Sequence, residues 1–224
     1  MIRLLGLDPG KHYDSFGLVL VEVEPQRKEI RVMGAKEWRG KAYLQIENEI
    51  AEIYQRHHVD HIVIERNHTG EHIYEVLQKQ KHLPVFAITT SNNINPERIH
   101  SGKTMDKNAT VQYLIQLIQE EKLIFPTIIK NPAVKELKRQ MTVFAEHRTE
   151  AGHLAYYAQG NEHDDLVMAL LLVCYIARER YFRERGVIMA QSKPKQKPFD
   201  NGPLIYDTQH SLWNQKDYAI YYPS

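Results

Sequence analysis

Four carboxylates stand at points in the sequence where a fold could bring them together. Asp8 follows the apolar run IRLLGL, and Glu65 follows the run HIVI. Asp164 and Asp165 are adjacent and open a long apolar segment, LVMALLLVCYIA. Because an unpaired buried carboxylate is costly in free energy, acids at the ends of buried elements need a partner. A divalent cation held by several oxygens is one such partner, and oxygen-only ligands suit Mg²⁺ or Mn²⁺.

Each acid taken alone has an ordinary structural explanation. An Asp-Pro-Gly at a strand end is more often a turn, and an Asp at a helix start is more often a cap. Three acids in this order, each at the end or start of a buried element, are a more specific signal. Two divalent ions about 3.5–4 Å apart clamp the attacking water and the leaving oxygen in phosphodiester hydrolysis. The acids therefore predict metal-dependent phosphodiester chemistry.

The elements that must position these acids alternate between strands and helices. Apolar, branched runs that end in turn residues predict strands over residues 2–7, 17–23, 29–38, 61–65 and 84–90. Apolar residues at helical spacing predict helices over residues 42–57, 71–81, 105–121, 132–146 and 164–183. A short extended piece is expected at 123–126 and an edge strand at 154–158.

This order predicts an α/β fold with a mixed five-stranded sheet and helices on both faces. The first three strands are expected to be antiparallel, and the rest to form parallel β-α-β units that cross over right-handed. In an open α/β sheet, the carboxyl ends of parallel strands line the crevice where ligands bind. Asp8 and Glu65 would then converge in this crevice. The positive end of the helix dipole would favour Asp164 and Asp165 beside them.

The composition excludes several classes of protein. Lys and Arg number 29 against 28 Asp and Glu, so any DNA contact has to come from a local patch. The one cysteine, Cys174, rules out a disulfide framework, and no zinc pattern or G-x-S-x-G motif occurs. The opening residues do not form a signal peptide, and the apolar run at 166–177 is too short to span a bilayer. The expected compartment is cytoplasm, that of an infected host if the protein is viral.

The length of 224 residues suits one well-filled domain, expected at 1–185. Beyond it, residues 186–224 are first rich in Pro and Lys and then in Tyr. This segment is expected to be an extended arm that docks on the domain or on a partner, with disorder as the alternative.

Three stretches together carry a resemblance: LLGLDPG…DSFGLVLV, HIVIERNHTG and GNEHDDLVMALLLVCYIA. The distinguishing patterns are E-x-N-x-x-G, formed by Glu65, Asn67 and Gly70, and H-D-D-x-V-x-A, which starts at His163. Over roughly residues 1–180 the chain resembles the RNase H-like nuclease domain of tailed-phage terminase large subunits. The resemblance implies an RNase H-like fold and a divalent-metal-dependent endonuclease that cuts concatemeric viral DNA during genome packaging.

The resemblance makes Asp8, Glu65 and Asp165 the catalytic and metal-binding acids, with Asp164 assisting. The implied cofactor is Mg²⁺ or Mn²⁺, as a pair of ions. In the mechanism expected from it, a metal-bound water attacks a DNA phosphate in line. Asp8 bridges both ions, Glu65 helps to fix one, and Asp165 the other. The accessory candidates near the acids are Asp14, Glu162, His163 and Asn67, although a solvated helix-entry position is the alternative for the histidine.

Phosphate binding needs local Lys and Arg. The candidates for DNA contact are Arg66, His68, Lys103, Lys107, Lys135, Lys138 and Arg139. The last three share one predicted helix, and a solvated helix face is their alternative. No recognition helix or zinc finger is evident, so sequence-specific reading of DNA is not expected.

Terminase large subunits also have an N-terminal ATPase, whereas this chain starts at the first nuclease strand. Its Walker-like fragment, residues 101–104, has Glu97 where the first glycine belongs, so no ATP hydrolysis is expected. The expected partners are double-stranded DNA, portal, the small terminase subunit and a separate ATPase domain, with no membrane. Two alternatives stay open: a RuvC-type Holliday junction resolvase, and a non-catalytic domain that docks on the packaging motor or on DNA.

Overall fold

The computed structural model describes residues 1–10, 15–67, 69–91, 104–128, 130–148, 154–158 and 163–183. The strands of the main sheet are β1 Ile2–Pro9, β2 Phe16–Glu24, β3 Glu29–Trp38, β4 His61–Glu65, β5 Val85–Ser91, β6 Thr104–Asp106 and β7 Leu123–Ile124. The helices are α1 Tyr43–Arg56, α2 Thr69–Glu75, α3 Lys107–Gln119, α4 Pro132–Val143 and α5 Asp165–Ile176. The π-helical segments Val76–Gln80 and Ala177–Tyr181 continue α2 and α5.

Within these ranges the sheet has seven strands in the order β6-β5-β4-β1-β2-β3-β7. β1 pairs antiparallel with β2, and β2 pairs antiparallel with β3. β1 also pairs in parallel with β4, β4 with β5, and β5 with β6. The five expected strands are all present, which confirms the mixed α/β fold, and the short β6 and β7 extend the sheet at its two edges.

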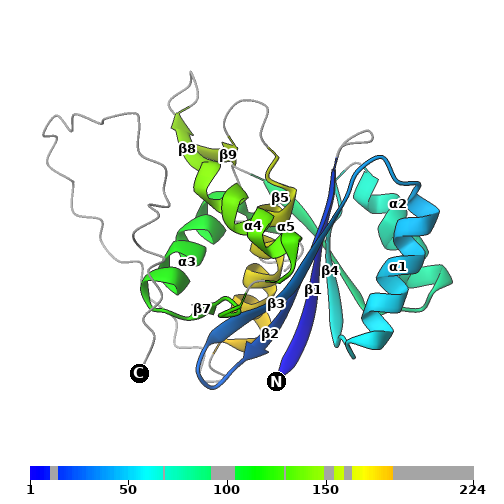
Figure 1. Ribbon diagram of the computed structural model, residues 1–224, viewed down its shortest axis with the longest axis horizontal. Helices are drawn as coiled ribbons and strands as arrows, with labels where there is room; N and C mark the ends of the chain where they lie inside the picture. Colours follow the sequence, from blue (N-terminus) through cyan, green and yellow to red (C-terminus); the bar gives the residue numbers. More distant parts are fainter. Residues whose placement is uncertain are drawn as a thin grey trace, which may run out of the picture.

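Alternate residues of β1 face two hydrophobic cores, as the pleat of a strand requires. Leu5 and Leu7 pack in a core with residues of α1 and α2. Leu4 packs in the other core, with residues of α3, α4 and α5. Figure 1 shows α1 and α2 on one face of the sheet and the other three helices on the opposite face. Asp8 lies on the same side of β1 as Leu4, so it points to the face that α5 covers.

α5 is the central helix of this second core. All its residues from Asp165 to Ile176 are buried, as is typical of a helix that is apolar on every side. Its close approach to the sheet requires Gly17 in β2, because a Cβ there would lie 2.5 Å from the Asp165 carbonyl oxygen. Gly17 is paired with Asp8 of β1, so the approach brings the start of α5 next to that acid.

None of the helices in the described ranges combines the length and the apolar character that a bilayer crossing needs. The domain boundary predicted at 185 and the arm predicted at 186–224 lie outside the described residues and stay predictions.

Of the two elements predicted near the end of the domain, the strand at 154–158 is confirmed and the helix is wrong in extent. The helix predicted at 132–146 ends at Val143, and Phe144–Arg148 form strand β8 instead. β8 pairs antiparallel with β9, Leu154–Ala158, in a separate two-stranded sheet, so residues 154–158 do not join the main sheet. The rings of Phe144 and Tyr156 stack across this pair with their centroids 6.4 Å apart. Both rings are buried, and this cross-strand aromatic contact favours the strand over a longer helix.

Replacing Gly17 with alanine should destabilise the protein. The new Cβ would push the first turn of α5 away from β2, and overpacking of this kind costs about 1–3 kcal/mol. Urea unfolding of Gly17→Ala measures the change. The control is Gly34→Ala in the adjacent β3, where a Cβ meets its nearest neighbour at an ordinary 3.7 Å. Equal losses in the two variants would contradict the account of the α5 approach.

Candidate active site

Asp8 and Glu65 lie side by side at the carboxyl ends of two parallel strands. Leu7 of β1 is paired with Ile64 of β4, and the two acids follow this pair directly. Asp8 is only 6% exposed, and its carboxyl is hydrogen-bonded to that of Glu65. Burial and the neighbouring Glu65 carboxylate raise the pKa of Asp8 well above its ordinary value. The raised pKa of Asp8 favours the protonated carboxyl, which could donate to Glu65.

The rest of the E-x-N-x-x-G pattern fixes Glu65. Asn67 donates from Nδ2 to Glu65 Oε1 at 2.8 Å and to the Thr90 carbonyl oxygen of β5 at 3.2 Å. Gly70, at the start of α2, lies so close to the Glu65 carbonyl that a Cβ there would be 1.7 Å from its oxygen. Asn67 thus orients the Glu65 carboxylate. Because Gly70 has no Cβ, α2 can begin in contact with the Glu65 carbonyl group.

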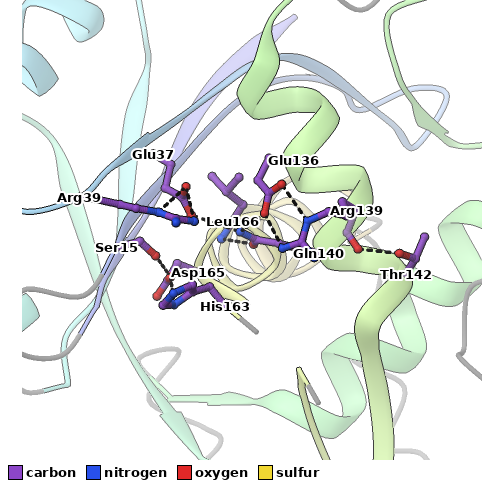
Figure 2. A network of polar contacts seen from close by, with 10 residues as sticks. All are labelled: Ser15, Glu37, Arg39, Glu136, Arg139, Gln140, Thr142, His163, Asp165 and Leu166. Carbon is purple, nitrogen blue, oxygen red and sulfur yellow. Dashed lines mark hydrogen bonds and ion pairs between the residues drawn. The ribbon is translucent and has the colours of Figure 1, made fainter. Parts of the chain in front are cut away.

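The second pair of acids lies at the N-terminus of α5. Ser15 donates from Oγ to Asp165 Oδ2 in a buried hydrogen bond, and His163 Nδ1 lies 3.8 Å from the same oxygen. Lys107 at the start of α3 places its Nζ 3.7 Å from Asp164 Oδ2. Figure 2 shows Ser15, His163 and Asp165 together at this end of α5.

Asp8 is coupled electrostatically to the other three acids. Asp165 and Asp164 both add to the rise in the pKa of Asp8, after burial and Glu65. Burial also raises the pKa of Asp165, to about 6. Asp164 and Glu37 add to this rise, whereas the Ser15 hydrogen bond and His163 oppose it.

The carboxylate oxygens suit a hard divalent cation, but they do not form a complete coordination shell. In the part of the chain that the structure describes, no three His, Cys, Asp or Glu side chains converge as a ready metal site. The acids meet as two pairs, and a cation between them would replace the proton that Asp8 donates to Glu65. Their oxygens are the ligands that Mg²⁺ and Mn²⁺ prefer. The shared cation site therefore stays a prediction.

Three polar residues at the site were missed by the sequence analysis: Ser15, Glu37 and Gln140. Glu37 of β3 is paired with Gly17, which is paired with Asp8, so it belongs to the same row across the sheet. Gln140 lies on the buried face of α4 with Val134, Leu137 and Met141. A polar residue on that apolar stripe was a usable signal, whereas nothing in the sequence marks Ser15.

The predicted DNA contacts have varied surroundings. Arg66 is exposed and is paired with Glu71, while Lys107 is largely buried between Asp164 and the Phe144 ring. On α4, Lys135 is exposed, Lys138 lies over the Phe125 ring and Arg139 is paired with Glu136. Asp14, His68, Lys103 and Glu162 lie outside the described residues.

Comparisons with known proteins agree with this fold. A family model described as "Terminase RNaseH-like domain" matches residues 5–174. Among solved structures, the large terminase nuclease from thermophilic phage G20c is 18% identical, over 77% of this chain and 80% of that one, with a TM-score of 0.59.

Two further solved structures have the same fold. The large terminase nuclease domain of Thermus phage P74-26 is 17% identical, over 79% of each chain, with a TM-score of 0.56. That of P22 is 10% identical, over 79% of this chain and 80% of that one, with a TM-score of 0.54. The predicted RNase H-like fold is confirmed. A search of curated proteins found no match.

Asp8→Asn should stabilise the protein in EDTA, and the gain should grow with pH. Because the pKa of Asp8 is raised in the folded state, folding keeps a proton that the unfolded chain releases above about pH 4. Stability is therefore lost as the pH rises towards the raised pKa, and a neutral asparagine avoids this loss. The gain should therefore be larger at pH 8 than at pH 5.

Thermal unfolding of the parent and of Asp8→Asn between pH 5 and pH 8 measures this gain. The control is Glu52→Gln, a carboxylate-to-amide change at an exposed position on α1, away from the four acids. An Asp8→Asn protein that is less stable than the parent at every pH would contradict the shared-proton arrangement.

Proposed function

Because this chain belongs to the Terminase RNaseH-like domain family, we propose that it is a divalent-metal-dependent DNA endonuclease, the nuclease of a large terminase. The observation that carries the proposal is the meeting of Asp8 and Glu65 at the carboxyl edge of the sheet, with Asp164 and Asp165 in electrostatic contact. In α/β sheets this edge is where ligands bind. Acids so placed are suited to hold cations against a phosphodiester.

The family fold supports the choice of cofactor. Solved large terminase nucleases of phage G20c have bound magnesium and bound cobalt. We propose Mg²⁺ or Mn²⁺ here, as a pair of ions, held by Asp8, Glu65 and Asp165 with Asp164 assisting. When bound, such ions polarise the phosphate and lower the pKa of the attacking water.

The chain's own residues would prepare the site for this chemistry. Asp8 would give up its proton and turn its oxygens to the cations. Asn67 holds the Glu65 carboxylate in one orientation through its hydrogen bond, and Ser15 does the same for the Asp165 carboxylate. Lys107 offsets part of the charge of Asp164, so that not every acid needs a cation. The exposed Arg66 beside Glu65 would bind a neighbouring DNA phosphate in exchange for Glu71.

The proposed substrate is double-stranded DNA, as viral concatemers cut during packaging in the host cytoplasm. Portal, the small terminase subunit and an ATPase domain are the proposed partners in that process. Among the described residues near the four acids, no basic side chain belongs to a DNA-binding motif whose helix reads base edges. Cutting should therefore be largely independent of DNA sequence.

Digestion of supercoiled plasmid tests the proposal. The parent chain should nick and linearise the plasmid in Mn²⁺ or Mg²⁺ and should stop in EDTA. Loss of an outer partner of a metal ligand costs about 10–100-fold, so removal of the ligand in Asp8→Asn should cost more. Linear duplex and four-way junctions should be cut alike, whereas cutting confined to junctions would point to a resolvase.

The matched control is Asp60→Asn, the same change just before β4, at the opposite end of that strand from Glu65. Asp60 accepts a hydrogen bond from the Arg3 backbone N–H at 2.7 Å and should not affect cutting. Circular dichroism verifies that both variants fold. Equal cutting by Asp8→Asn and the parent, or cutting that persists in EDTA, would reject the nuclease proposal.

A further inference from the structure

Helix α5 carries the Asp164–Asp165 pair but does not cap its own N-terminus. The first N–H groups of a helix have no partner within it and are usually met by the side chain of the N-cap residue. Asp164, at the N-cap position, makes no such hydrogen bond. Instead the Leu166 N–H donates to Gln140 Oε1 of α4 at 3.0 Å. The Gln140 side chain of α4 thus takes the place of an N-cap side chain for α5.

Gln140 is held in one orientation. Its side chain is fully buried, and its Nε2 donates to Glu37 Oε1 at 3.3 Å and to Glu136 Oε1 at 3.5 Å (Figure 2). A flipped amide would turn Oε1 towards these two carboxylates and Nε2 towards the Leu166 N–H, so both sides would repel. The carboxylates therefore aim the Gln140 oxygen at α5.

Two arginines fix the carboxylates in turn. Arg39 Nη2 lies 3.0 Å from Glu37 Oε2, and Arg139 Nη2 lies 2.7 Å from Glu136 Oε1. Because Glu37 is on β3 and Glu136 is on α4, the amide of Gln140 ties the sheet, α4 and the first turn of α5 together. Figure 2 shows this network next to the Ser15–Asp165 pair.

The first turn of α5 is consequently held from two sides. The backbone of Gly17, which is paired with Asp8, lies against the Asp165 carbonyl, and Gln140 binds the N–H of the next residue. Without the Gln140 oxygen, the buried Leu166 N–H would lose its partner, and an unsatisfied buried donor destabilises the fold. The turn would relieve that cost by fraying, and its two acids would move with it.

We propose that Gln140 is a positioning residue of the nuclease site: it accepts from the Leu166 N–H and thereby keeps Asp164 and Asp165 beside Asp8. Its consequence for metal binding and cutting rests on the proposed function, whereas its consequence for the first turn of α5 does not. A helix-packing role alone would lower stability without changing the first turn or the response to a metal ion.

Two variants of Gln140 separate these roles. Gln140→Met has a similar volume but offers no oxygen to Leu166. Gln140→Glu keeps an acceptor for the Leu166 N–H. Because burial between Glu37 and Glu136 favours the protonated carboxyl, its O–H still donates one hydrogen bond to these carboxylates. If the methionine variant does not fold, Gln140→Asn replaces it, because its amide is one methylene shorter and cannot reach Leu166. Val134→Ala is the control, since it weakens the packing of α4 on its buried face and leaves the hydrogen bond intact.

Hydrogen exchange of the Leu166 amide in EDTA is the first measurement. Exchange should be at least about tenfold faster in Gln140→Met, which is the factor for a loss of about 1.4 kcal/mol, and close to the parent rate in Gln140→Glu and Val134→Ala. Unchanged exchange in Gln140→Met would overturn the proposal. So would an equal acceleration in Val134→Ala.

Titration with Mn²⁺ is the second measurement, read by thermal unfolding and by plasmid nicking. The Mn²⁺ concentration for half of the effect should rise about 10–100-fold in Gln140→Met and much less in Gln140→Glu. An unchanged Mn²⁺ midpoint in Gln140→Met would overturn the positioning role. If the parent shows neither nicking nor a Mn²⁺ effect, the proposed function fails, and the Leu166 exchange still decides the role of Gln140 in the fold.

Discussion

Repulsion among carboxylates at one edge of the sheet is the constraint on which the rest of the site depends. Asp8 and Glu65 lie together at this edge, and burial and its acidic neighbours raise the pKa of Asp8, which lowers their mutual repulsion. Asp165 is held against the same edge with a pKa of about 6. Such a cluster lowers the stability of the fold at neutral pH, so packing elsewhere must hold it in place. That is the usual relation between a strained functional site and its scaffold.

The packing of α5 contributes most to holding these acids in place. The helix is buried along its whole length and lies directly against β2 at Gly17, so its first turn cannot retreat from the sheet without opening the core. The polar contacts then set the details. Ser15 orients the Asp165 carboxyl, Asn67 orients Glu65, and Gln140 completes the start of α5. The contacts of Ser15 and Gln140 join segments distant in sequence, so the site depends on the fold as a whole.

This dependence explains what could be predicted from the sequence. The strands that end at Asp8 and Glu65 and the helix that begins at Asp165 follow from apolar runs bounded by polar residues, which are local signals. That Asp8 and Glu65 are neighbours follows from the parallel strand pairing expected of a β-α-β unit. Ser15 and Gln140 could not be assigned this way, because their partners are 150 and 26 residues away and depend on the register of packed elements. The end of α4 was misplaced for the same reason, since the Phe144–Tyr156 contact that replaces the last helical turn forms only in the folded chain.

Paramagnetic broadening by Mn²⁺ tests most directly whether these acids meet around one cation site. In a spectrum of the assigned protein, small amounts of Mn²⁺ should broaden the amide signals of Asp8, Glu65 and Asp165 together. The signal of Asp60, at the far end of β4, should stay sharp. Broadening that reaches only one of the three acids, or that centres on another part of the surface, would contradict the account.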